Sequence, residues 1–144
     1  MQQNTFHPEN LSETMLEICR LLVRLGGSPN FKGFWQCAHA VDLAIREPIR
    51  LTLVTKWLYP DAAKPFRTTW LAVERNIRTL RDLIWEKHPE LLSELAGFVL
   101  SSRPKAACLL AILTFHFMDG LPDDAEQIKT QMYHDFGADC NSVA

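Results

Sequence analysis

The sequence predicts an all-α fold, a compact bundle of about six helices that contains a helix-turn-helix. Apolar residues recur at the three- and four-residue spacing of helices along most of the chain, and no run alternates as a half-buried strand does. Only six of the 144 residues are glycine. The length fits one domain, and a hydrophobic share of 47% with a charged share of 22% is typical of globular proteins.

Turn and cap residues set the first two expected helices. The first should start after Asn10 or Ser12, because either side chain can accept a hydrogen bond from a free backbone N–H. The second is expected over residues 31–46, with Asn30 as a candidate cap. Gly33, near its start, would allow another helix to pack closely.

Prolines divide the middle of the chain. A third helix is expected before Pro60, because proline suits the first position of a new helix. Pro65 limits this new helix to little more than a turn, because proline clashes with the preceding turn. Thr68 or Thr69 then caps a long helix that runs to about Trp85.

Two further helices are expected, over residues 90–98 and 105–118. The predicted organisation is a flexible N-terminus at 1–10, a helical domain at 11–119 and an acidic extension at 120–144. The extension contains apolar residues at a spacing that can form one extra C-terminal helix.

The long helix has two different faces. Its core-facing stripe is predicted to consist of Trp70, Val73, Ile77, Leu80 and Ile84. The opposite face is predicted to carry Leu71, Ala72, Arg75, Arg78, Thr79 and Asp82. A short helix, a turn and then a helix with exposed threonine and arginine match the helix-turn-helix plan, in which the second helix enters the DNA major groove.

The residue types on this face suit DNA. Arginine can donate two hydrogen bonds to guanine, and the threonines at the helix N-terminus suit a phosphate. Exposed Leu71 could touch a thymine methyl group. The net charge is −2, but basic residues dominate between residues 45 and 81, and acidic residues dominate after residue 118. An alternative remains open, in which Glu74 and Arg78 simply pair on a solvated face.

The segment LVTKWLYPDAAKPFRTTWLAVERNIR (Leu53 to Arg78) resembles the C-terminal effector domain of the sporulation response regulator, the stage zero sporulation protein A family. That family has a similar T-K-x-L-Y-P-D-x-A-x-x-F-x-T-T-x-x-x-V-E-R-x-I-R core. Two flanking segments, Leu21 to Val41 and Leu91 to Ala106, are also similar. The resemblance covers about Leu16 to Met118 and rests on a long, ungapped central motif.

The resemblance implies an all-helical, cytoplasmic transcription regulator of sporulation. Its partners would be double-stranded DNA, bound through the helix-turn-helix by tandem copies on adjacent sites, and RNA polymerase. Five residues match the family's second helix by position, namely Thr68, Thr69, Glu74, Arg75 and Arg78. The complete set of expected DNA-binding residues is Lys64, Arg67, Thr68, Thr69, Leu71, Ala72, Glu74, Arg75, Arg78 and Thr79.

Three features depart from the family pattern. Ala72 stands where the family has an arginine that we associate with base reading. Pro65 replaces a residue that would extend the short helix. We also expect no receiver domain, because only some 15 residues precede the resemblance, so the aspartyl-phosphate switch would not operate in this chain.

Other functional classes lack their motifs. No G-x-S-x-G, P-loop, H-E-x-x-H or glycine-rich dinucleotide turn is present, so we expect no enzyme, cofactor, metal or small-molecule substrate. His39 and His116 are expected to be packing residues, and the four cysteines reduced and mostly buried thiols. No secretory signal and no apolar run of about 20 residues occurs, so we expect a cytoplasmic protein without a membrane span.

A competing interpretation uses the same scaffold. A helix-turn-helix domain without its base-reading arginine could be a protein-protein interaction module that binds a transcription factor or a second copy of itself. In either case the acidic extension could cover the basic face and compete with phosphates. DNA binding with a measurable salt dependence would separate the two interpretations.

Overall fold

The computed structural model describes residues 6–118, and within them the chain forms six α-helices and no strand. The α-helices are α1 (Glu13–Arg24), α2 (Lys32–Arg46), α3 (Tyr59–Ala63), α4 (Trp70–Lys87), α5 (Pro89–Ala96) and α6 (Ala106–His116). Short helical turns connect them, namely η1 (Pro8–Asn10), η2 (Pro48–Thr52), η3 (Val54–Leu58) and η4 (Lys64–Phe66). The all-α prediction is confirmed, and the expected extra C-terminal helix lies outside the described residues.

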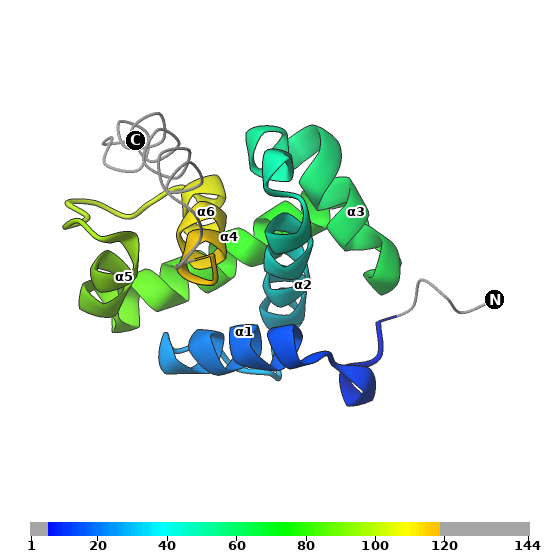
Figure 1. Ribbon diagram of the computed structural model, residues 1–144, viewed down its shortest axis with the longest axis horizontal. Helices are drawn as coiled ribbons and strands as arrows, with labels where there is room; N and C mark the ends of the chain where they lie inside the picture. Colours follow the sequence, from blue (N-terminus) through cyan, green and yellow to red (C-terminus); the bar gives the residue numbers. More distant parts are fainter. Residues whose placement is uncertain (1–5, 119–144) are drawn as a thin grey trace.

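Helix α4 is the long axis around which the others pack. It runs behind α2 and α6, with α3 near one end and α5 at the other, while α1 lies across α2 (Figure 1). Residues of α6 from Cys108 to Phe115 are all buried, so this helix is apolar around its whole circumference and fills the centre. The remaining helices each turn one apolar side toward this core.

The helix ends follow the cap chemistry only in part. The Ser12 hydroxyl accepts a hydrogen bond from the Met15 backbone N–H at 3.2 Å, so Ser12 rather than Asn10 caps α1. Helix α2 starts after Phe31, whose side chain makes no cap hydrogen bond, so the expectation for Asn30 is wrong. Gly33 lies in the first turn of α2, directly against the backbone of Asn76 in α4, as its close-packing prediction requires.

The chain between α2 and α4 is less regular than expected. In place of one helix ending before Pro60, it forms η2, then the wide π-helical turn η3, which continues into α3. The Leu58 N–H bonds to the Leu53 carbonyl, a spacing of five residues. This wider turn makes room for the Pro60 ring, which would clash with a carbonyl of a regular α-helix. Helix α3 is short, as the position of Pro65 predicted.

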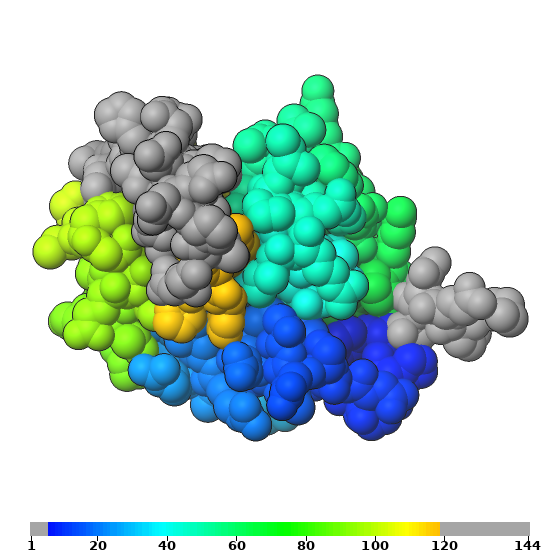
Figure 2. Space-filling view, viewed as in Figure 1, coloured from blue at the N-terminus to red at the C-terminus, as the bar shows by residue number. Residues whose placement is uncertain are grey.

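The N-terminal segment is folded onto the domain from Phe6 onward. The Phe6 ring stacks on Phe66 with centroids 4.9 Å apart and lies 5.4 Å from the Trp35 ring. Its backbone N–H donates to the Pro65 carbonyl at 3.0 Å. In the space-filling view this segment and α1 form one edge of the molecule (Figure 2). Phe6 therefore packs against the domain, while the flexibility expected for segment 1–10 stays a prediction.

Membrane-spanning helices and metal-binding clusters can be assessed only in the part of the chain that the structure describes. Within residues 6–118 no helix is long and apolar enough to cross a membrane. The same residues contain no group of three or more His, Cys, Asp or Glu side chains that could hold a metal ion. Cys19 and Cys37 are free thiols, as expected, but Cys108 is disulfide-bonded, so the expectation of reduced cysteines is wrong for that residue.

Candidate nucleic-acid interface

The turn between α3 and α4 is built from η4 and a left-handed residue. Arg67 has φ 53° and ψ 45°, the conformation that glycine usually supplies at such a position. The Arg67 N–H bonds to the Lys64 carbonyl at 3.2 Å, and the Thr68 N–H bonds to the Ala63 carbonyl at 3.4 Å. This pair of hydrogen bonds is the Schellman arrangement that ends a helix. The turn therefore forms without the glycine that its sequence lacks.

The threonine pair starts α4. The Thr69 hydroxyl accepts a hydrogen bond from the Ala72 N–H at 3.1 Å, so Thr69 is the N-cap. Thr69 is exposed and Thr68 is half-buried. Because a hydroxyl that accepts one hydrogen bond can still donate another, the capped end retains a donor for an anion next to the positive end of the helix dipole.

Four residues of the predicted stripe anchor α4 to the core. Val73, Ile77, Leu80 and Ile84 are all fully buried. Trp70 is the exception, because 37% of it is exposed, and its assignment to the stripe is wrong. Trp70 is the first residue of α4, three residues before Val73, where the buried stripe begins. The four buried residues still fix which face points outward.

The outward face of α4, defined here by Leu71, Arg75, Arg78, Thr79 and Asp82, is exposed along its length. Leu71 is 59% exposed. Among the described residues Arg75 has no ion-pair partner, in contrast to Arg78, which pairs with Glu74 at 3.3 Å. Thr79 donates its hydroxyl hydrogen back to the Arg75 carbonyl at 3.1 Å. The face thus presents one uncompensated guanidinium in its centre.

The two other basic residues of the expected site lie in the turn. Lys64 is exposed and pairs with Asp61 at 3.1 Å, and Arg67 is exposed as well. Such surface ion pairs contribute about 0–1 kcal/mol, so an approaching phosphate can replace the carboxylate at small cost. The same holds for the Glu74–Arg78 pair. The ion pair between Glu74 and Arg78 agrees with the alternative in which this face is simply solvated. It agrees equally well with a face that contacts DNA.

A pocket of about 450 Å³ opens beside the outward face, between α2 and α4. Its lining residues are Lys32, Trp35, Gln36, Phe66, Thr68, Ala72, Arg75 and Asn76. The Asn76 side-chain amide donates to the Gln36 side-chain oxygen at 2.9 Å across this contact. Ala72 has the smallest side chain in the lining, so this position leaves open space in the pocket.

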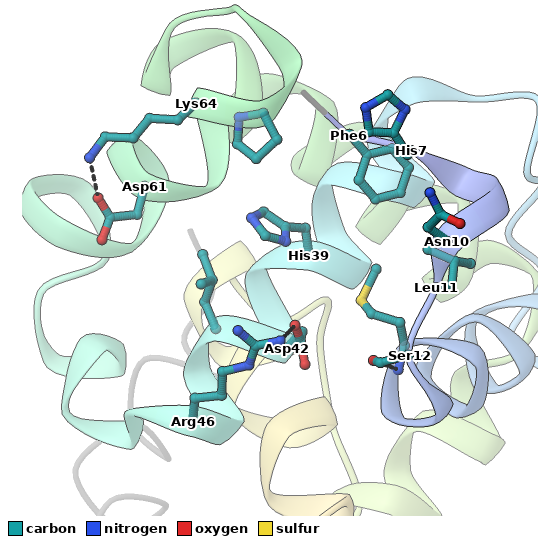
Figure 3. A pocket seen from close by; sticks show the side chains of 13 residues that line it. Phe6, His7, Asn10, Leu11, Ser12, His39, Asp42, Arg46, Asp61 and Lys64 are labelled. Atoms are coloured by element: carbon teal, nitrogen blue, oxygen red, sulfur yellow. Dashed lines mark hydrogen bonds and ion pairs between the residues drawn. The ribbon is translucent and has the colours of Figure 1, made fainter. Parts of the chain in front are cut away.

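A further pocket of about 540 Å³ lies between the N-terminal segment, α2 and α3 (Figure 3). Its charges are balanced, because Arg46 pairs with Asp42 at 2.8 Å and Lys64 with Asp61. Burial, reinforced by nearby arginines, lowers the pKa of His39 to about 4, so its imidazole is neutral at physiological pH. These pairs leave no excess of positive charge between them, and His39 packs edge-on against Phe66, as the sequence predicted.

Arg50 connects the irregular segment to the short helix of the motif. Its side chain is 12% exposed and donates to Asp61 at 2.7 Å and to Glu47 at 2.9 Å. The guanidinium also lies 5.1 Å from the centre of the Trp57 ring. Sequence reasoning treated Arg50 only as part of the basic segment. The structure shows that it holds η2 against α3 and thereby helps to place the turn.

The structure also brings basic residues next to α4 that the sequence-based site did not include. Lys32 lines the pocket on one flank of α4, while Arg81, Arg103 and Lys105 line a pocket on its other flank. Only Lys32 had a nearby signal, because it precedes Gly33, whose lack of a side chain allows α2 to approach α4. Arg81 lies on α4 itself, whereas Arg103 and Lys105 come from the loop before α6 and could not be assigned from local spacing.

These elements define a compact all-helical domain. The family described as "Sporulation initiation factor Spo0A C terminal" matches residues 18–116, and this chain belongs to that family. The family is a DNA-binding effector domain that regulates transcription in sporulation, and it is not an enzyme family. The resemblance stated from the sequence is confirmed.

Proposed function

We propose that this chain is a sequence-specific DNA-binding transcription regulator whose α4 enters the major groove with its first turns. The observation that supports this most directly is the environment of Arg75. Its guanidinium is exposed, has no ion-pair partner among the described residues and stands on a helix whose opposite side is fully buried. An arginine held in this way loses little conformational freedom from the backbone and can donate two hydrogen bonds to a guanine.

The neighbouring residues would divide the remaining contacts. Thr68, Thr69, Lys64 and Arg67 surround the start of α4 and suit the phosphate backbone. Exposed Leu71 suits a thymine methyl group, and Glu74, when it releases Arg78, can accept from a cytosine amino group. Ala72 leaves a hollow instead of a donor, so we propose that the chain reads a different site from relatives with arginine there. Contacts with RNA polymerase and pairing of two copies on adjacent DNA sites remain part of the proposal.

The test is selection from a random duplex pool at two salt concentrations. The wild type should enrich a defined sequence and lose affinity as salt rises, because bound phosphates release counterions. Arg75→Ala should cost about 1–3 kcal/mol and relax the preference at one base pair. Arg24→Ala is the matched control, because Arg24 is an exposed arginine at the end of α1.

Three outcomes would count against the proposal. Equal effects of Arg75→Ala and Arg24→Ala would show that α4 does not read the bases. Enrichment of no sequence would leave only non-specific binding. Absence of binding at low salt would favour the interaction module, in which the same scaffold binds a protein.

A further inference from the structure

A second basic pocket lies on the flank of α4 that faces α6. It has a volume of about 410 Å³ and is lined by Val54, Tyr59, Glu74, Arg78, Arg81, Arg103, Lys105, Ala106 and Ala107. Helices α3, α4 and α6, the turn η3 and the loop before α6 contribute to it. Only Glu74 and Arg78 belong to the DNA-binding residues proposed above. We call this site the flank pocket.

The flank pocket carries a net positive charge. Its four cationic side chains are Arg78, Arg81, Arg103 and Lys105. Two carboxylates oppose them, because Glu74 pairs with Arg78 at 3.3 Å, and one oxygen of Asp82 accepts from Arg81 at 2.9 Å and from Arg103 at 2.8 Å. The three arginines alone outnumber the two carboxylates, and Lys105 adds a further cationic side chain to the lining. A single carboxylate oxygen shared by two arginines does not use up the donors of either guanidinium.

The backbone N–H groups at the start of α6 add hydrogen-bond donors, and they lie at the positive end of the helix dipole. Lys105 is the N-cap of α6, its side chain makes no cap hydrogen bond, and no acidic residue lies in the first turn. Ala106 and Ala107 line the pocket, so the positive end of the helix dipole lies beside the cationic side chains. Backbone N–H groups and arginines together are the usual partners of a phosphate.

The flank pocket lies beside the face proposed to read DNA. Glu74, Arg78 and Arg81 recur along one side of α4, next to outward-facing Arg75. On the opposite flank, Lys32 and Thr68 line the pocket next to Ala72. A helix in a major groove about 12 Å wide has a phosphate strand on each side. Cationic groups on both flanks of α4 match this arrangement.

We propose that the flank pocket binds a phosphate of the DNA backbone, with Arg103 and Lys105 as its main contacts. This inference rests on the proposed function and extends it to the loop before α6. Arg103 would exchange Asp82 for the phosphate, while the start of α6 adds backbone donors. Because phosphate contacts carry no base information, these residues add affinity and fix the orientation of α4 without changing the preferred sequence.

The test uses Arg103→Ala and Lys105→Gln in the full chain, with Arg24→Ala as the control. Binding to the enriched duplex and to an unrelated duplex is measured from 50 to 200 mM salt. Each variant should lower the magnitude of the salt slope by about 0.9 and weaken binding to both duplexes by the same factor. The base preference should stay as in the wild type, and Arg24→Ala should change none of these values. Urea unfolding of both variants checks that the fold is retained.

The possible results separate this inference from the proposed function. If the wild type binds DNA and both variants keep its salt slope, the proposed phosphate contact in the flank pocket is refuted. The proposed role of α4 is unaffected by that result. A changed base preference would also refute the phosphate contact, because Arg103 or Lys105 would then contact bases. If ³¹P NMR shows that inorganic phosphate binds to the wild type but not to Arg103→Ala, while the DNA slope is unchanged, the pocket binds free anions instead. No DNA binding by the wild type would refute both proposals.

Discussion

The contact between α2 and α4 makes Gly33→Ala an informative substitution. A Cβ atom at Gly33 would lie 2.6 Å from the Asn76 carbonyl oxygen and would also overlap the Phe31 ring. Ordinary van der Waals contact begins at 3.4 Å, so the two helices would have to separate by the difference of 0.8 Å, unless the backbone bends. The Gln36–Asn76 hydrogen bond, now 2.9 Å, spans the same contact and would lengthen.

The expected cost follows from two opposing terms. Overpacking a tight contact costs about 1–3 kcal/mol. Alanine is preferred over glycine inside a helix by up to about 1 kcal/mol, which offsets part of that cost. If the full offset applies, we expect Gly33→Ala to lower the free energy of unfolding by about 0–2 kcal/mol. DNA affinity should fall as well, because the obstacle is the backbone of the helix that carries Arg75.

Urea unfolding measures the stability, and a shift of the midpoint at constant m-value would show a change in stability alone. Repeating Gly33→Ala in a Phe31→Ala background separates the two obstacles. If the Asn76 carbonyl is the main obstacle, the cost of Gly33→Ala should be the same in both backgrounds. Increased stability in Gly33→Ala would refute the reasoning, because the helices would then have room for a methyl group.

Three further predictions concern the supporting structure. Because burial holds the pKa of His39 at about 4 and the unfolded value is 6.5, its stabilising effect is present above pH 6.5 and is lost as pH falls toward 4. Between pH 7 and pH 4 the free energy of unfolding should therefore fall by up to about 3 kcal/mol more in the wild type than in His39→Gln. The same pH dependence of this free energy in both proteins, measured by urea unfolding, would contradict the prediction. Arg50→Ala removes the ion pair of Glu47 and leaves Asp61 paired with Lys64 alone, so it should cost about 1–3 kcal/mol in urea unfolding, whereas no loss would mean that η2 and α3 are held by packing alone. Phe6→Ala removes the ring stacked on Phe66 and should lower stability by about 1–2 kcal/mol, while His7→Ala, an exposed neighbour, should leave the unfolding midpoint unchanged.

The core of this domain was largely predictable because apolar residues at helical spacing mark the buried side of a helix. The spacing identified Val73, Ile77, Leu80 and Ile84, and all four are buried. It failed for Trp70 because a helical wheel gives the direction of a side chain but not its distance from the packed centre. It also failed before Pro60, where one helix was expected and the chain forms η2 and the π-helical turn η3, although a new short helix does begin next to Pro60 as predicted.

The candidate site was predictable only where its residues lie on one helix. The exposure of Arg75 and Leu71 followed from their position opposite the apolar stripe. The flanking cations did not follow, because Lys32 and Arg103 reach α4 through tertiary packing of segments far apart in the chain. The left-handed conformation of Arg67 had no signal either, because glycine marks such positions in sequence and here it is absent.

Site-specific photo-crosslinking tests the central claim, that the outward face of α4 lies in the major groove, most directly. A photo-reactive phenylalanine derivative replaces Leu71, which is 59% exposed on α4, or Val23, which is 51% exposed on α1. Both variants are irradiated with the enriched duplex at saturating protein concentration. We expect Leu71 to crosslink to bases of the selected site and Val23 to give no base crosslink. Base crosslinks from Val23, or none from Leu71 while the DNA remains bound, would contradict the proposed interface.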